Sequence, residues 1–356
     1  MAKHERSLSL FPIMDQAPPD AAPSDKTGIA RMAAEGQIVG EGHLIEFHGL
    51  RVRSMLNRTA SRRGMAFDWS INPYRGCEFA CRYCYARYTH DYLELRGPEE
   101  FERKIFIKQN AAWLLEQELK RVRAEEEIAI GTATDPYQPI ERQAKVTRSL
   151  LELLSRQKGL RLGLVTKSTL IERDIPLLLK IAQDNTLVLH LTITTPSARL
   201  ARLLEPRAPR PDLRLRTVSR LRQAGLTAGI LCSPVLPGIT DTAKAIDAMA
   251  AKARAADASF FSAQPLFLKP CSKATYLGLI QEHFPELEEM YKQRFAKDAF
   301  VSVAYRKRIA ALVEAARNRH GLARRPGGGE LTAPVTAPIK PVHGRQGEVD
   351  FELTGS

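Results

Sequence analysis

Short runs of aliphatic and β-branched residues alternate along this chain with stretches whose apolar residues have helical spacing. The apolar runs cover 128–134, 161–168, 187–195, 226–235 and 259–268, and the helical stretches cover 145–157, 170–182, 212–224 and 241–255. Strands that alternate with helices pair in parallel through right-handed crossovers. With one more strand near 67–72, six such units can curl into an open partial (β/α)6 barrel. We therefore predict an α/β fold with its reactive groups at the carboxyl ends of the strands.

Both ends of the chain differ from this body in composition. Residues 17–24 are rich in proline and alanine, and residues 325–341 combine a glycine run with several prolines. Such segments bury too little apolar surface to offset the entropy of ordering. We predict a disordered leader at 1–44, the barrel with its C-terminal helices at 45–320, and a flexible tail at 321–356. Asp241 and Thr242 can cap the helix expected at 241–255.

Composition limits the cellular location and the kind of binding partner that we expect for this chain. The chain of 356 residues is 44% hydrophobic and 26% charged, and no stretch approaches the roughly 20 apolar residues of a membrane span. The N-terminus lacks the apolar core of a secretory signal, so we expect a cytoplasmic protein with no membrane contact. The 53 Lys and Arg outnumber the 40 Asp and Glu, for a net charge of +13. This excess favours nucleic acid as a partner, although it can equally serve solubility alone.

Three of the five cysteines lie within eight residues, in the order Cys77, Cys81 and Cys84. This spacing is poor for a disulfide framework and good for a metal centre, because a tight loop can wrap several thiolates around one site. If the centre is an iron–sulfur cluster with four irons, three cysteines bind three of them and leave the fourth iron open, as a reactive centre requires. The alternative is a structural zinc site with His90 as the fourth ligand, although a solvated helix position is the more usual place for such a histidine.

The pattern Cys-x3-Cys-x2-Cys, with Tyr83 before the last cysteine, resembles the signature of the radical S-adenosylmethionine (SAM) superfamily. Further segments look like radical enzymes related to spore photoproduct lyase; these segments are 72–77, 131–141, 166–168, 205–207 and 233–238. The resemblance implies a partial barrel of radical SAM type, a [4Fe–4S] cluster on the three cysteines, and S-adenosylmethionine bound to the open iron. It also implies a 5′-deoxyadenosyl radical that abstracts hydrogen from the substrate, an electron donor such as flavodoxin or ferredoxin, and a place for Tyr83 near the adenine.

The resemblance also suggests cofactor-binding residues at the strand ends. Thr134 and Asp135 stand where the superfamily commonly has a Gly-Gly-Glu that binds the methionine amine, a pattern from which this chain departs; Asp135 before a proline is also a good turn former. Lys167 and Ser168 end the next strand and can reach the cofactor, or Ser168 can simply cap a helix. The arginines expected near the cofactor carboxylate, because guanidinium forks suit carboxylates, are Arg207 and Arg214.

Two further features concern the substrate. Cys232 and Cys271 follow the fifth and sixth predicted strands and are candidate hydrogen-atom donors, although a free cysteine is usually only a small hydrophobic residue. The segment 51–63 is basic and free of acidic residues; its arginines are Arg51, Arg53, Arg58, Arg62 and Arg63. Such a segment can grip a nucleic-acid backbone or be a flexible linker.

These features favour an enzyme that forms a radical on its substrate, with a nucleobase in DNA or RNA as one candidate. A peptide or small-molecule substrate is the alternative within that class. The alternative from another class is a nucleic-acid-binding protein whose metal site only holds a loop together.

Overall fold

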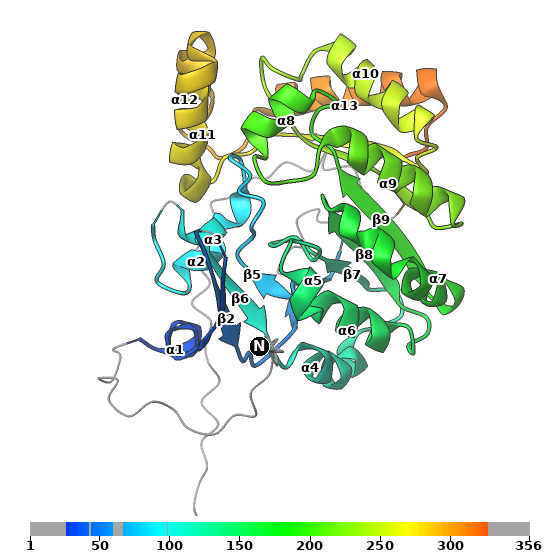
Figure 1. Ribbon diagram of the computed structural model, residues 1–356. Coiled ribbons are helices and arrows are strands. Elements are labelled where there is room, and N and C mark those ends of the chain that lie inside the picture. Colours follow the sequence, from blue (N-terminus) through cyan, green and yellow to red (C-terminus); the bar gives the residue numbers. More distant parts are fainter. Residues whose placement is uncertain (1–25, 43, 60–66, 98, 327–356) are drawn as a thin grey trace, which may run out of the picture.

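The computed structural model describes residues 26–42, 44–59, 67–97 and 99–326, and their larger sheet confirms the predicted partial barrel (Figure 1). This sheet has seven strands in the order β11-β10-β9-β8-β7-β4-β3. Strand β3 (Leu56–Arg58) is antiparallel to β4, and every other neighbouring pair in the sheet is parallel. The parallel strands are β4 (Trp69–Ile71), β7 (Glu127–Ile130), β8 (Arg161–Thr166), β9 (Thr186–Thr192), β10 (Ala228–Val235) and β11 (Phe261–Pro265).

Burial explains why these runs become central strands. All residues of β9 after Thr186 are buried, so both faces of the strand are covered, as is usual in parallel sheets. One side of the sheet is covered by the helices that the sequence predicts (Figure 1). Those helices are α6 (Val146–Leu154), α7 (Ile175–Asp184), α9 (Pro211–Gln223) and α10 (Ala243–Ala255). Thr242 caps α10 by accepting a hydrogen bond from Ala245 N at 3.1 Å, whereas Asp241 bonds Tyr305 Oη at 2.8 Å on the C-terminal helix.

A second sheet, which the sequence did not predict, has four strands in the order β1-β2-β6-β5. These strands are β1 (Ile38–Gly42), β2 (Ile45–Leu50), β6 (Lys104–Lys108) and β5 (Tyr74–Arg75), and helix α1 (Gly28–Ala34) precedes them. Part of the predicted leader is therefore ordered, because Ala30 and Ala33 are buried and β1 pairs with β2. Residues 1–25 of that leader lie outside the described residues.

The remaining elements complete the cover of the two sheets. They are α2 (Tyr88–Asp91), α3 (Glu100–Arg103), α4 (Ala111–Glu118), α5 (Glu141–Ala144), α8 (Ala198–Leu204), α11 (Pro270–His283), α12 (Glu288–Arg294) and α13 (Val303–His320), with 3₁₀ turns η1 (Tyr85–Arg87), η2 (Leu119–Arg121), η3 (Thr169–Asp174) and η4 (Pro285–Leu287). Just after α13, Ala323 O accepts a hydrogen bond from Phe261 N at 3.2 Å, so the start of the predicted tail packs on β11. Residues 327–356 lie outside the described part of the chain. Among the described residues, no helix is long and apolar enough to cross a membrane.

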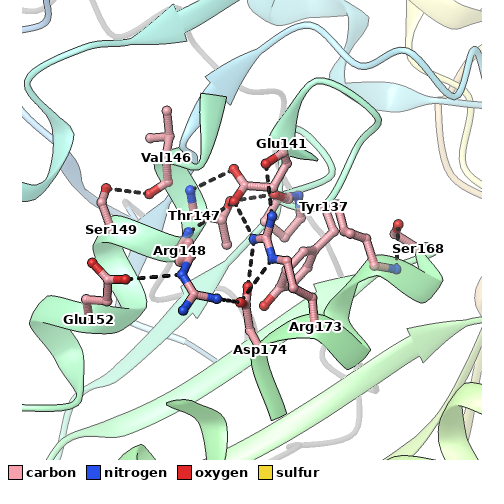
Figure 2. Close-up of polar contacts among 12 residues, drawn as sticks. Tyr137, Glu141, Val146, Thr147, Arg148, Ser149, Glu152, Ser168, Arg173 and Asp174 are labelled. Carbon is pink, nitrogen blue, oxygen red and sulfur yellow. Dashed lines mark hydrogen bonds and ion pairs between the residues drawn. The ribbon is translucent and has the colours of Figure 1, made fainter. Parts of the chain in front are cut away.

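A buried ionic cluster joins the first helices of the barrel (Figure 2). The carboxylates of Glu141 and Asp174 have no exposed surface. Arg173 contacts both, at 2.9 Å and 2.8 Å, and Arg148 contacts Asp174 at 2.6 Å. Glu141 also accepts the backbone N–H of Thr147 at 2.9 Å. Because each buried carboxylate has several donors, the cost of burying its charge is offset.

Replacing Asp174 with Ala should lower the free energy of unfolding by about 3 kcal/mol. Breaking a buried ion pair typically costs about 3–5 kcal/mol, and the lower end applies because Arg148 and Arg173 are 36% and 24% exposed and can reach water. Glu152→Ala is the matched control, since Glu152 pairs with the same Arg148 at 3.2 Å but is 49% exposed; its cost should stay below about 1 kcal/mol. Urea denaturation of the two variants and the parent gives both values, and equal losses would contradict this account.

Candidate functional site

The three clustered cysteines lie on a loop, 76–85, that follows the short strand β5; we call it the cysteine loop. Gly76 begins it with φ +82°, and a Cβ at this position would lie 2.8 Å from the carbonyl oxygens of Phe101 and Lys104. Only glycine therefore fits this start. Cys77 N donates to Phe101 O at 3.0 Å, and Cys84 N donates to Cys81 O at 3.1 Å. The backbone thus holds the loop in a tight turn against the segment that precedes β6.

The segment after β7 clamps the cysteine loop from the other sheet. The Thr134 hydroxyl donates to Gly76 O at 2.5 Å, so this predicted cofactor ligand has a structural partner. Gln138 Oε1 accepts the backbone N–H of Glu78 at 2.9 Å, and Glu78 Oε1 accepts that of Ile140 at 2.7 Å. Sequence reasoning missed both residues, although Gln138 lies in the segment 131–141 on which the family resemblance rests and Glu78 lies between Cys77 and Cys81.

The surroundings of the three thiols disfavour the charged thiolate form that binds a metal, so a positive charge nearby is needed to stabilise it. Cys81 is buried and Cys77 and Cys84 are partly buried. Burial raises the pKa of all three thiols, and with all contributions included that of Cys81 is about 12; the charges of neighbouring thiols contribute to the rise at Cys77 and Cys81. Lys167 lowers the pKa of both Cys81 and Cys84. A cationic side chain beside mutually close thiols is the setting that stabilises thiolates for metal binding.

The turn after β8 presents Lys167 to this loop. Asp135 orders the turn, since its carboxylate accepts hydrogen bonds from Thr166 Oγ1 at 2.6 Å and from Lys167 N at 2.7 Å. Ser168 caps η3 by accepting from Leu170 N at 3.2 Å. The Lys167 ammonium lies 5.7 Å from the centre of the Tyr83 ring and makes no hydrogen bond to a described residue. Burial lowers its pKa, but the charges of Cys81 and Glu205 outweigh this effect and raise it.

Arg214, another predicted cofactor ligand, is instead bound up inside the protein. It is 1% exposed and pairs with Glu205 at 2.6 Å. Its other nitrogens donate to Thr192 O at 3.0 Å and Pro209 O at 2.7 Å. The Tyr83 hydroxyl joins the same network through Glu205 and Thr194. This network favours a positioning role for Arg214, beneath Tyr83, over the direct cofactor contact that the sequence predicted; Glu205 is a member that sequence reasoning missed.

Comparison with known proteins decides the family. The description "Radical SAM superfamily" matches residues 71–249, about half of the chain, and this match includes the cysteine loop and the strands β5 to β10. The chain belongs to the radical SAM superfamily. Members of this superfamily are enzymes that use S-adenosylmethionine and an iron–sulfur cluster. Membership therefore confirms the enzyme and not the binding protein with a structural metal.

Relatives of this radical SAM chain include uncharacterized proteins. One from Mycobacterium tuberculosis is 30% identical over 317 residues, which cover 88% of this chain and 91% of the relative. Another, from Methanocaldococcus jannaschii, is 29% identical over 171 residues, or 48% and 61% of the two chains. Among solved structures, a double mutant of spore photoproduct lyase with bound AdoMet and dinucleoside spore photoproduct has a TM-score of 0.53 at 14% identity, covering 79% of this chain and 80% of that one. At this identity the likeness shows a shared fold.

The remaining predicted residues of the radical SAM site lie around the cysteine loop. Arg207 is exposed, and its backbone N–H donates to Phe79 O at 3.4 Å, so it lies over the loop. Cys232 is 4% exposed on β10, with its Sγ 3.6 Å from Thr194 O. Cys271 is partly buried at the start of α11, with its Sγ 3.5 Å from Tyr85 O. Of the two, Cys271 is therefore the one that touches the cysteine loop.

His90 is found in neither of the two settings considered from the sequence, which were the fourth ligand of a zinc site and a solvated helix position. It is 1% exposed, with ring centroids 5.2 Å from Phe101 and 5.8 Å from Phe106, so it is not a solvated helix residue. Its Nε2 bonds Lys104 O at 2.9 Å, and burial lowers its pKa to about 4. Across the described ranges, no three His, Cys, Asp or Glu side chains are arranged to hold a single metal ion. Cluster ligands each bind a different iron, so they need not converge on one point.

Replacing Gln138 with Ala should weaken the clamp on the cysteine loop. The buried Glu78 N–H would lose its acceptor, which costs about 1–3 kcal/mol of unfolding free energy, and less iron should stay bound after desalting of the reconstituted protein. Gln143→Ala is the control, because Gln143 is exposed on α5 and its replacement should cost within about 0.5 kcal/mol. Denaturant unfolding and iron analysis measure both effects; a Gln138 variant that matches the control in both would show that the clamp is dispensable.

Proposed function

We propose that this enzyme holds a [4Fe–4S] cluster on Cys77, Cys81 and Cys84 and uses it to cleave S-adenosylmethionine. The supporting observation is the placement of three thiols on one loop beside Lys167, whose ammonium has no hydrogen-bond partner among the described residues. Three thiolates fit a cluster with one iron left open, as derived above from their spacing. The pairing of thiols with a cation fits the negative charge that such ligands carry.

When bound there, the cluster supplies the electron that splits the sulfonium to a 5′-deoxyadenosyl radical. The protein's own residues do the rest of the work. Lys167 neutralises the thiolates and offers its free ammonium to the carboxylate of the methionine moiety. Asp135 holds the turn that aims Lys167, and Tyr83 presents its ring beside it while its hydroxyl is tied to Glu205. Preorganised groups of this kind cost no reorganisation during the reaction.

Lys167→Met should weaken S-adenosylmethionine binding by about 1–3 kcal/mol, because one charged contact is removed while the length of the side chain is kept. The reconstituted parent, reduced with dithionite in place of flavodoxin or ferredoxin, should release 5′-deoxyadenosine. The Cys81→Ala variant should bind little iron and release no 5′-deoxyadenosine. Anaerobic equilibrium dialysis gives the affinity, and chromatography of the products gives the cleavage.

Lys180→Met serves as the matched control for that experiment, because Lys180 is exposed on α7 and lies outside the cysteine loop, so this variant should bind S-adenosylmethionine as the parent does. A full iron complement in Cys81→Ala would overturn the cluster assignment. Equal affinities in Lys167→Met and the parent would move the carboxylate contact to another residue, with Arg207 as the next candidate.

We further propose a nucleic-acid substrate. The net charge of +13 and the basic segment 51–63 support it, and a spore photoproduct lyase of the same fold binds a dinucleoside photoproduct. Within that segment, Arg58 pairs with Glu126 at 3.3 Å and lies 5.1 Å from the centre of the Trp69 ring, so its guanidinium has partners within the protein although its side chain is 62% exposed. Arg62 and Arg63 lie outside the described residues. The peptide or small-molecule alternative applies if nucleic acid is not bound.

Replacing Arg62 and Arg63 together with Ala should make nucleic-acid binding less sensitive to salt. Each phosphate neutralised on duplex DNA contributes about −0.9 to the slope of log affinity against log salt, so the double variant should lose up to about two units of slope. Arg58→Ala, whose guanidinium already has Glu126, should keep the slope of the parent. Fluorescence anisotropy with a labelled duplex measures all three; no binding by the parent at low salt would overturn the substrate proposal.

A further inference from the structure

A cavity of about 260 Å³ lies against the small sheet, apart from the three cysteines and Lys167. Helix α1 forms one side of it, the loop after β2 forms another, and the ends of β5 and β6 form the floor. Its apolar wall is Ile29, Met32 and Val52, and its cations are Arg53, Arg75 and Lys108. Gly28, Ser54 and Asn57 also line it. No acidic residue is among the described residues that line it.

Lys108 is the deepest of the three cations. It is 4% exposed at the end of β6, and its ammonium makes no hydrogen bond or ion pair with any described residue. Burial, together with the charge of Arg75, lowers its pKa to about 7. Glu118 is the acid that acts on it from a distance, but Glu118 Oε2 already accepts the backbone N–H groups of Met55 and Leu56, each at 2.8 Å. The lysine therefore lacks a local counter-charge.

The other two cations are also available. Arg75 gives one nitrogen to Thr89 O at 3.3 Å, while its Nε is buried without a hydrogen-bond partner. Arg53 is exposed and forms no ion pair within the described ranges. Buried cations in proteins are normally paired, because an uncompensated charge costs several kcal/mol. The contrast with Glu141 and Asp174, which have several donors each, marks this cluster as lacking an anion.

We propose that this cavity binds a phosphate group, carried by a phosphate ester whose organic part rests on the apolar wall. A phosphate group carries up to two charges and several acceptor oxygens, so it can meet an ammonium and two guanidinium groups at once. A carboxylate presents two oxygens in one plane, whereas the oxygens of a phosphate, as monoester or diester, point in tetrahedral directions and can face cations on several sides. We infer an ester because Ile29, Met32 and Val52 cannot bind the phosphate itself. These apolar side chains can instead pack against a sugar or another carbon skeleton.

The test is isothermal titration of the full-length protein with inorganic phosphate and with the dinucleotide thymidylyl-thymidine, whose phosphate is a diester, at constant ionic strength. Lys108→Met should weaken binding of whichever probe binds the parent by about tenfold or more, the effect of losing one charged hydrogen bond. Lys120→Met is the matched control, because Lys120 is exposed and does not line the cavity, and it should bind as the parent does. Arg53→Gln, at an exposed position that does not threaten folding, should weaken binding at least threefold.

Thermal unfolding separates a binding defect from a folding defect. Lys108→Met should melt no lower than the parent without phosphate, because it removes an unpaired buried charge, and it should lose the stabilisation that phosphate gives the parent. Binding of the dinucleotide but not of inorganic phosphate would support the pocket as a seat for a nucleic-acid phosphate; the reverse would support a small phosphate ester. No binding of either probe, or equal binding by Lys108→Met and Arg53→Gln and the parent, would overturn the proposal. Since no step of the test involves S-adenosylmethionine, its failure is distinct from that of the proposed function.

Discussion

The reactive centre depends on the hydrogen bonds that tie the cysteine loop to the segment after β7. The loop follows β5 of the small sheet, while Thr134 and Gln138 lie in the segment that follows β7 of the large sheet, so these bonds also link the two sheets. They satisfy backbone groups of Gly76 and Glu78 that would otherwise be buried without partners. The loop is thus held from both sides, by Thr134 and Gln138 on one side and by Phe101 on the other.

Buried charge is handled in two contrasting ways in this molecule. The Glu205–Arg214 pair has its geometry completed by backbone carbonyls and by Tyr83, which makes it a rigid support. Lys167 and Lys108 are different, because neither ammonium has a hydrogen-bond partner among the described residues. The Glu205–Arg214 pair has its hydrogen bonds satisfied within the protein and needs no further partner. A desolvated cation without a hydrogen-bond partner, in contrast, is stabilised by an anion that binds beside it. This contrast is the basis of both ligand sites proposed for the chain.

Local sequence patterns predicted the strands of the barrel but not those of the small sheet. Strand β8, at Arg161–Thr166, falls within the predicted run at 161–168 because its apolar residues are contiguous and buried. Strand β5 has only two residues, too few to show a period. Strand β2 alternates Ile45 and Phe47 with polar residues, but it is short, its first four residues are only partly buried, and its partner β6 lies far along the chain. Helix α1 and strand β1, which fall within the expected leader, are placed by their contacts with β2, and composition did not reveal these contacts.

The sequence by itself determined the barrel units and the three thiols of the reactive loop, because strand periodicity and cysteine spacing are properties of neighbouring residues. It could not distinguish Lys167 from Arg214, two cations on adjacent stretches of the same barrel with equal chemical claims on a cofactor carboxylate. Only the tertiary structure decided that Arg214 meets Glu205 and two carbonyls, while the Lys167 ammonium has no hydrogen-bond partner among the described residues. The reason is physical: the partner of a buried charge is set by distances between elements far apart in the chain, and those distances exist only after folding.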